Sequence, residues 1–81
     1  MAALYVVATP IGNLEDVTYR ALRILGEVDL VACEDTRQTV KLLNRYGVRA
    51  SLTAFHSRNA RKSAPALLRL LDEGKSLALV T

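Results

Sequence analysis

Residues 34–37, Glu-Asp-Thr-Arg, place two carboxylates, a hydroxyl and a guanidinium where an apolar run ends and a helical pattern begins. Carboxylates are favoured at a helix N-terminus, and an arginine can pair with them. This cluster could transfer a proton or bind a polar ligand. An acidic helix cap with an exposed ion pair is the simpler interpretation, and it explains Asp35 or Thr36 without requiring Glu34.

Other candidate residues follow neighbouring apolar runs. His56 could carry a proton or make a polar contact, although a lone histidine after a strand is commonly structural. Pro10 and Gly12 form a turn that could let the backbone approach a flat or compact ligand, or could be a turn only. The glycine patterns that bind nucleotide polyphosphates are missing from this loop, which disfavours such ligands. Cys33 lies inside an apolar run and is interpreted as a packing residue.

Four apolar runs, expected to be strands, precede these residues: 3–9, 30–33, 51–55 and 76–81. The first run is continuous and predicts a strand that is buried on both faces. Asp16 can cap a first helix whose apolar face holds Val17, Ala21, Ile24, Leu25 and Val28.

A second helix starts at a cap formed by Asp35 or Thr36 and ends near Tyr46. Its apolar stripe is expected to hold Val40 and Leu43, with Leu42 and Tyr46 beside it. A third helix could start at Ser57 or Asn59, with an apolar face made of Ala60, Ala64, Leu67, Leu68 and Leu71. Pro65 predicts either a start near Ser63 or a kink.

The order β-α-β-α-β-α-β predicts an α/β fold, an open parallel sheet with helices on both faces. Ligands of such sheets bind at the carboxyl ends of the strands, so residues 9–13, 34–37 and 56–57 should share one edge.

The fourth apolar run, residues 76–81, is too apolar to lie without neighbouring strands. We therefore expect the chain to be the N-terminal part of a larger protein. The open edge of the fourth strand is expected to promote self-association, as in a homodimer.

Composition narrows the class of protein. Of the 81 residues, 51% are hydrophobic and 23% charged, which is typical of a globular segment and excludes a disordered one. Apolar runs are too short to cross a membrane. A single cysteine fits a reducing, cytoplasmic setting, and no Cys/His cluster offers a metal site. Aromatic residues make up only 5%, which argues against a platform of stacked bases.

Positive charge is concentrated in one part of the chain. Residues 36–71 contain eight basic side chains and no Asp or Glu, which indicates an anionic partner unless the acidic counterpart lies elsewhere on a solvated surface. Arg37, Lys41 and Arg45 are spaced four apart and should form one row on the second helix. Arg58, Arg61 and Lys62 form a second basic group.

Two segments carry a resemblance to a known family: residues 8–14, Ala-Thr-Pro-Ile-Gly-Asn-Leu, and residues 34–37, Glu-Asp-Thr-Arg. They resemble the N-terminal domain of the tetrapyrrole methylase superfamily. Other segments share this resemblance: 4–7, 16–18, 20–22, 28–32, 42–43, 74–75 and 78–80. The resemblance covers nearly the whole chain. Its two main segments are specific together and unspecific apart.

The resemblance implies residues 1–81 of a two-domain protein whose C-terminal domain is absent, with S-adenosylmethionine bound between the domains. It is strongest to members that methylate a ribose 2′-hydroxyl, which implies a cytidine of small-subunit ribosomal RNA as the substrate. A tetrapyrrole or other small molecule, or a non-catalytic α/β binding module, is the alternative. The family's small-residue loop after the fourth strand is missing, so the isolated chain is expected to be inactive.

Several residues acquire expected roles from the resemblance. Pro10, Ile11, Gly12 and Thr36 would contact the cofactor. Glu34, Asp35 and His56 are the candidates for the base that takes the hydroxyl proton, without a ranking among them. The two basic groups, Arg37, Lys41 and Arg45 and then Arg58, Arg61 and Lys62, would hold RNA phosphates without reading sequence.

Overall fold

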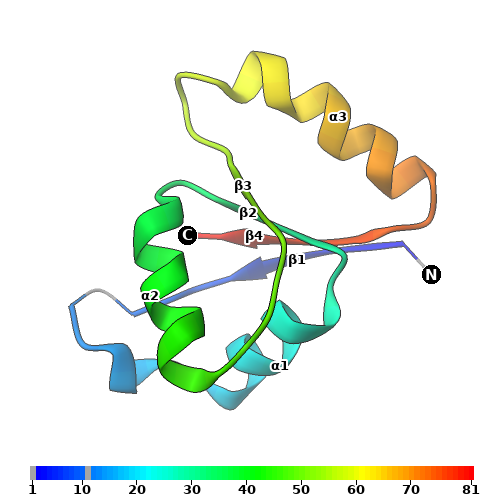
Figure 1. Cartoon of the computed structure of the whole chain (residues 1–81). Helices are drawn as coiled ribbons and strands as arrows, with labels where there is room; N and C mark the ends of the chain where they lie inside the picture. Colours follow the sequence, from blue (N-terminus) through cyan, green and yellow to red (C-terminus); the bar gives the residue numbers. More distant parts are fainter. Residues whose placement is uncertain (1, 11) are drawn as a thin grey trace.

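A computed structural model describes residues 2–10 and 12–81 (Figure 1). Along the chain it contains the elements β1 (Ala3–Val7), η1 (Leu14–Asp16), α1 (Tyr19–Glu27), β2 (Leu30–Cys33), α2 (Thr36–Tyr46), β3 (Leu52–Ala54), α3 (Ala60–Asp72) and β4 (Ser76–Val80). The short 3-10 turn η1 was not expected. The alternation of strands and helices confirms the predicted α/β class.

All strand pairs are parallel, and the sheet order is β1-β4-β2-β3. Ala78 of β4 lies opposite Tyr5 of β1 on one side and Val31 of β2 on the other. The expectation of an open edge at the fourth strand is therefore wrong, because β4 has a partner on each side. In the described part of the chain the edge strands are β1 and β3, so self-association through a strand edge would use one of these.

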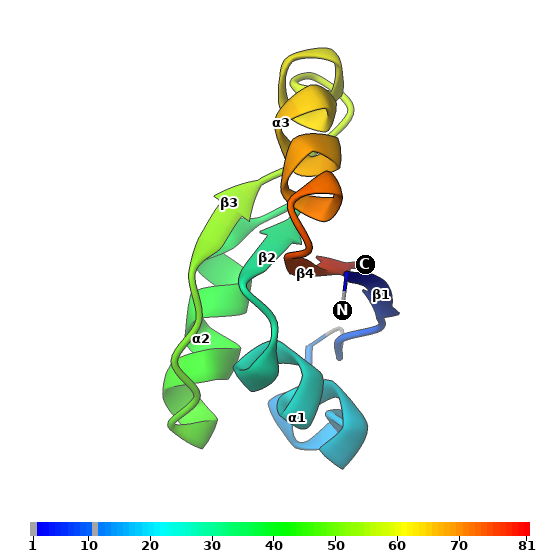
Figure 2. The ribbon, with the colours of Figure 1, turned by 90° about the vertical axis from the view of Figure 1, so that its right-hand side faces the viewer.

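Helices cover the sheet from both sides: α1 and α2 lie on one face and α3 on the other (Figure 2). Successive side chains of a strand point to opposite faces of the sheet, so β4 contributes residues to the packing on both faces. Ala78 and Val80 point into the core with Ile24 and Leu25 of α1 and Leu42 of α2. Leu77 and Leu79 alternate with them and line a hollow beneath α3.

Local capping sets where α1 and α2 begin. The side chain of Thr18 accepts a hydrogen bond of 3.0 Å from the backbone N–H of Ala21, so Thr18 and not Asp16 caps α1. Asp16 instead ends η1. Asp35 caps α2 by accepting a hydrogen bond of 3.0 Å from the N–H of Arg37, which decides between the two candidates.

The apolar stripe of α2 differs from the predicted one by one position. Leu42 and Leu43 are buried, as expected, but Val40 is 42% exposed. Thr39 takes the buried place, and its hydroxyl donates a hydrogen bond of 3.3 Å to the backbone oxygen of Asp35. A helical threonine can be buried in this way because the preceding turn accepts its proton.

The helix α3 has no fully buried residue, although its predicted apolar face does turn toward the sheet. Leu68 remains 61% exposed. The helix starts at Ala60, directly after Asn59, which confirms Asn59 as the start. It continues through Pro65, so the alternative start near Ser63 is wrong. Asn59 occupies the cap position without capping α3 through its side chain.

The strand β1 is more exposed than its apolar sequence suggests. Leu4 and Val6 are 55% and 59% exposed, which contradicts the expectation of a strand buried on both faces. As an edge strand it lacks a second neighbouring strand in the described part of the chain, and α1 packs against it near the buried Val7. No helix in the described part of the chain is long and apolar enough to cross a membrane.

Candidate functional site

The carboxyl ends of the four strands meet at one edge of the sheet, as parallel pairing requires. Here Thr81, after β4, is joined to the segment after β1: its N–H donates to the oxygen of Val7 over 3.0 Å. The hydroxyl of Thr9 donates in return to the oxygen of Thr81 over 3.1 Å. These bonds hold the start of the Thr9–Gly12 segment beside the end of β4.

A first hollow of about 220 Å³, which we call the threonine hollow, opens between the ends of β1, β4 and β2. It is lined by Thr9, Glu34, Asp35, Gln38, Thr39, Val80 and Thr81. A smaller extension of about 70 Å³ continues from Thr9, Gln38 and Thr39 to Pro10 and Gly12. The loop after β1 and the first turn of α2 thus form one continuous surface.

A second hollow of about 400 Å³, the histidine hollow, lies between the ends of β2 and β3. It is lined by Glu34, Asp35, Thr36, Arg37, Ala54, His56, Ser57 and Arg58. Glu34 and Asp35 line both hollows. The two carboxylates therefore stand at the point where the hollows meet.

These two carboxylates have different surroundings. Asp35 Oδ1 accepts the N–H of Arg37 and lies 3.6 Å from the same residue's Nε, so this side chain is occupied by capping and pairing. The exposed side chain of Glu34 has no hydrogen bond or ion pair within the described part of the chain. Of the two, Glu34 is the carboxylate available to a ligand.

His56 is positioned by its neighbour Asn59. The backbone N–H of His56 donates to Asn59 Oδ1 over 2.8 Å, and Asn59 Nδ2 donates to the oxygen of Ala54 over 3.0 Å. The ring atom Nδ1 is buried, and no described residue provides it with a hydrogen-bond partner. A buried ring nitrogen without a partner is uncommon in folded proteins.

Cys33, at the end of β2, does not belong to the site. Its side chain is fully buried, and its Sγ lies 3.7 Å from the oxygen of Thr53. Burial raises the pKa of this thiol, while a hydrogen bond with Thr39 acts in the opposite direction and the charge of Asp35 raises it further. The thiol is therefore protonated at neutral pH and packs in the core, as expected.

Most of the predicted site residues lie at this edge. Pro10 and Gly12 line the small extension, and Thr36 lies in the histidine hollow, away from them. Ile11 is outside the described residues. Gln38 was missed, although its place three residues after the cap Asp35 puts it on the turn nearest the strand ends.

The six basic residues expected to hold phosphates are all exposed: Arg37, Lys41, Arg45, Arg58, Arg61 and Lys62. Arg37 pairs with Asp35 at 3.6 Å, and the other five have no ion pair within the described part of the chain. Arg37 and Arg58 both line the histidine hollow. One basic group therefore starts at this hollow and follows α2, while the other follows the start of α3.

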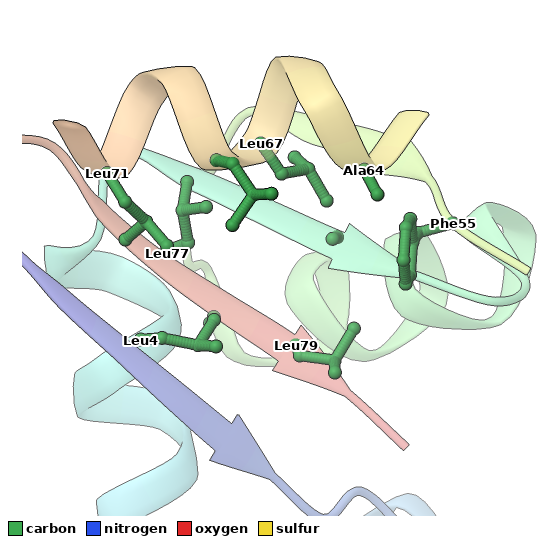
Figure 3. Close-up of a pocket in the computed structure, with 10 residues that line it drawn as sticks. Leu4, Phe55, Ala64, Leu67, Leu71, Leu77 and Leu79 are labelled. Carbon is green, nitrogen blue, oxygen red and sulfur yellow. The ribbon is translucent and has the colours of Figure 1, made fainter. Parts of the chain in front are cut away.

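An apolar groove of about 180 Å³ lies between α3 and the sheet (Figure 3). Ala64, Leu67 and Leu71 of α3 face Leu77 and Leu79 of β4 across it. The groove offers no polar side chain, so it does not suit a reacting group. No group of three or more metal-ligating side chains is present in the part of the chain that the structure describes.

Comparison with known proteins gives a consistent result. The profile of the Tetrapyrrole (Corrin/Porphyrin) Methylases matches residues 3–81. A protein of Mesorhizobium japonicum named ribosomal RNA small subunit methyltransferase I is 54% identical over 79 residues, which are 98% of this chain and 27% of that protein. Proteins of the same name from Thermotoga maritima and Bacillus subtilis are 52% and 47% identical over all 81 residues.

The chain spans 36% of the Thermotoga maritima protein and 28% of the Bacillus subtilis one, and thus about a third of the length of these relatives. Almost every residue of the chain lies inside the family match. The parallel sheet with its polar carboxyl edge has the architecture expected from that resemblance. The chain belongs to the tetrapyrrole methylase family.

Proposed function

We propose that the complete protein is an S-adenosylmethionine-dependent methyltransferase that acts on a ribose 2′-hydroxyl of small-subunit ribosomal RNA, at a cytidine. Its relatives carry the name of a small-subunit ribosomal RNA methyltransferase at 46–54% identity. Within the chain, the unpaired carboxylate of Glu34, where the two hollows meet, is the observation that carries the proposal. Such a substrate implies a protein of the cytoplasm.

The threonine hollow fits part of the methyl donor. S-adenosylmethionine has ribose hydroxyls and cationic groups, which suit the hydroxyl of Thr9, the amide of Gln38 and the carboxylate of Glu34. When bound, the cofactor supplies an electrophilic methyl group on a sulfonium. The hollow, at about 220 Å³, is smaller than the 300 to 1,000 Å³ typical of complete small-molecule sites. We infer that other parts of the protein complete it.

Glu34 and His56 are the proposed proton acceptors for the attacking hydroxyl. Both line the histidine hollow, and the exposed carboxylate of Glu34 has no partner in the described part of the chain. Asp35 is less suited, because its carboxylate already caps α2 and pairs with Arg37. We therefore assign Asp35 the task of positioning the first turn of α2, which carries Gln38 and Thr39.

The histidine hollow is proposed to receive the RNA. Arg37, in the first turn of α2, and Arg58, between β3 and α3, line it and can hold phosphates on either side of the reacting ribose. Lys41 and Arg45 extend this charge along α2, and Arg61 and Lys62 extend it along α3. Binding of this kind weakens steeply with salt, because each phosphate contact releases condensed counterions.

The exposed apolar groove supports the view that the chain is one portion of a larger unit, an N-terminal domain followed by a second domain. Leu68 and Leu4 both line the groove and are more than half exposed. Contiguous apolar surface of this kind is normally covered by protein. The chain spans only 27% to 36% of the length of these relatives, so the complete protein has further chain that can cover the groove.

The test is methyl transfer from labelled S-adenosylmethionine to small-subunit ribosomal RNA by the complete protein. Glu34→Gln and His56→Leu are expected to lower kcat by about 10²- to 10⁴-fold if the residue acts as the base. Glu73→Gln is the matched control. Glu73 lies directly after α3, at the end of the sheet where the strands begin and not where they end. It should leave the rate unchanged.

Three results would contradict the proposal. Retention of full activity by both variants would remove this edge of the sheet from the mechanism. Methylation of a small molecule but not of RNA, with an RNA affinity that does not respond to salt, would favour a small-molecule methyltransferase. Absence of any methyl transfer or donor binding would favour a non-catalytic binding module.

A further inference from the structure

The outer surface of α1 and α2, away from the strand ends, contains a wide shallow hollow of about 530 Å³. It is lined by Glu15, Val17, Tyr19, Leu22, Arg45 and Tyr46. We propose that this hollow, which we call the tyrosine hollow, binds an unpaired nucleobase of the RNA substrate by stacking. The inference rests on the proposed function, since it assumes an RNA substrate.

Tyr19 is the first observation behind this proposal. It is the first residue of α1 and is 91% exposed, although a tyrosine ring is largely apolar. Its ring contributes almost nothing to the core, so the fold does not explain its presence. Stacking on a base would cover one face of the ring and leave the hydroxyl in water.

The second observation is the rigidity of the wall beside it. The hydroxyl of Tyr46 donates a hydrogen bond of 2.9 Å to the backbone oxygen of Leu14, which fixes this ring against η1. Arg45 lies next to it in the chain and has no ion pair within the described residues. A planar guanidinium and a tyrosine ring together are suited to a flat aromatic ligand.

The charges around the tyrosine hollow favour a neutral base over a phosphate as its ligand. The carboxylate of Glu15 lines the same hollow and would repel a phosphate placed inside it. A neutral base suffers no such repulsion, and its amino group can donate to a carboxylate. The low aromatic content of the chain excludes an extended platform, but one exposed ring is sufficient for one base.

The basic row on α2 leads from the histidine hollow to the tyrosine hollow, so one RNA strand can reach both. Arg37, Lys41 and Arg45 follow one side of α2, and Arg37 lines the histidine hollow while Arg45 lines the tyrosine hollow. At 1.5 Å per residue the row is about 12 Å long. An RNA strand that follows the row places one nucleotide at the strand ends and another at Tyr19.

The experiment measures binding of the complete protein to a small-subunit ribosomal RNA fragment over a range of salt concentrations. Tyr19→Ala is expected to weaken binding by about 5- to 150-fold, the range for loss of one stacked base. Tyr19→Phe should bind like the unaltered protein, because it keeps the ring. Neither variant removes a charge, so the salt dependence should stay the same.

Arg45→Ala provides the contrasting result. It should lower both the affinity and the slope of log affinity against log salt by about one phosphate contact, because Arg45 ends the basic row that the RNA backbone follows. The matched control is Arg69→Ala, which removes a positive charge from the exposed last turn of α3 and does not line the tyrosine hollow. A 2-aminopurine base in the RNA should be quenched by the unaltered protein and Tyr19→Phe, but not by Tyr19→Ala.

Unchanged affinity of Tyr19→Ala, or an equal loss in Tyr19→Phe, would overturn the stacking proposal. These results differ from failure of the proposed function. In that case the unaltered protein itself would neither bind nor methylate RNA, whatever residue stands at position 19.

Discussion

The hydroxyl of Tyr46, at the end of α2, donates a 2.9 Å hydrogen bond to the backbone oxygen of Leu14, which lies 32 residues earlier in the chain. Leu14 begins η1 and follows the Pro10–Gly12 segment. This bond therefore holds the loop after β1 against the same helix whose first turn lines the threonine hollow. It connects both walls of that hollow to α2.

Tyr46→Phe removes this bond and little else. We expect the free energy of unfolding to fall by about 1 kcal/mol, since the partly buried oxygen of Leu14 loses its donor. Urea unfolding of the complete protein measures the change, and hydrogen exchange of the η1 amides should become faster. Tyr5→Phe is the control, because no hydrogen bond of the Tyr5 hydroxyl is found in the described residues. An equal effect of both substitutions would contradict the assignment.

Substitutions of Asp35 can distinguish a role as the cap of α2 from a role as the base in methyl transfer. Asp35→Ala removes the side-chain acceptor for the N–H of Arg37 and should destabilise the protein by about 1 kcal/mol. Asp35→Asn keeps an acceptor and should stay within about 0.5 kcal/mol of the original protein. If Asp35 only positions α2, the asparagine variant should also retain most of the methyl transfer. A loss of two orders of magnitude in that variant would instead make Asp35 the base.

Gly47 ends α2 with φ at +66°, in the left-handed region. Gly47→Ala should lower stability by about 1 kcal/mol, because a Cβ disfavours that backbone conformation. Gly26→Ala is the matched control, since it lies inside α1, where alanine is the better helix former and its Cβ would meet only Val48 Cγ1 at 3.5 Å. Thermal unfolding of the two variants should therefore shift in opposite directions. A shift in the same direction would count against the backbone explanation.

The buried thiol of Cys33 predicts a dependence of stability on pH. Burial raises its pKa, so the folded protein holds this proton more tightly than the unfolded chain does. The contribution to stability is complete below about pH 8.5, the ordinary value for an unfolded thiol, and is lost as the pH rises through the folded pKa. Cys33→Val removes the group, so its stability should decline less between pH 8.5 and 10.

Denaturant unfolding of both proteins across that range measures the difference, and the other alkaline groups cancel because they are common to both. Alkylation of Cys33, followed by mass spectrometry of its peptide, should be slow in the folded protein. Parallel stability curves for the two proteins would show that the thiol makes no such contribution.

Much of the fold could be predicted because its signals are local. The run Leu30–Cys33 was predicted with the bounds that the structure gives to β2, and the apolar face of α1 is buried at Ala21, Ile24 and Leu25. The grouping of Glu34, Asp35 and His56 at one edge follows from parallel strands alone. The alternation of strands and helices was sufficient for that step.

The errors come from properties that no local pattern contains. Strand order decides which apolar run is an edge, so the exposure of β1 could not be read from its residues. Whether Val40 or Thr39 faces the core depends on how α2 rotates on the sheet, because the two positions differ by one step of the helix. Gln38 was missed since an uncharged amide carries no distinctive spacing.

The position of β4 has a consequence for how this protein folds. β1 and β2 are not neighbours in the sheet, because β4 lies between them. Neither strand can pair with β4 until Ser76–Val80 has inserted there. Loop closure over such separations is slow, since chain entropy is lost before any pairing energy is gained. During synthesis, the residues up to Lys75 can form helices and the β2–β3 pair, but β1 has nothing to pair with. Its exposed residues Leu4 and Val6 therefore have no strand beside them until Ser76–Val80 has been synthesised.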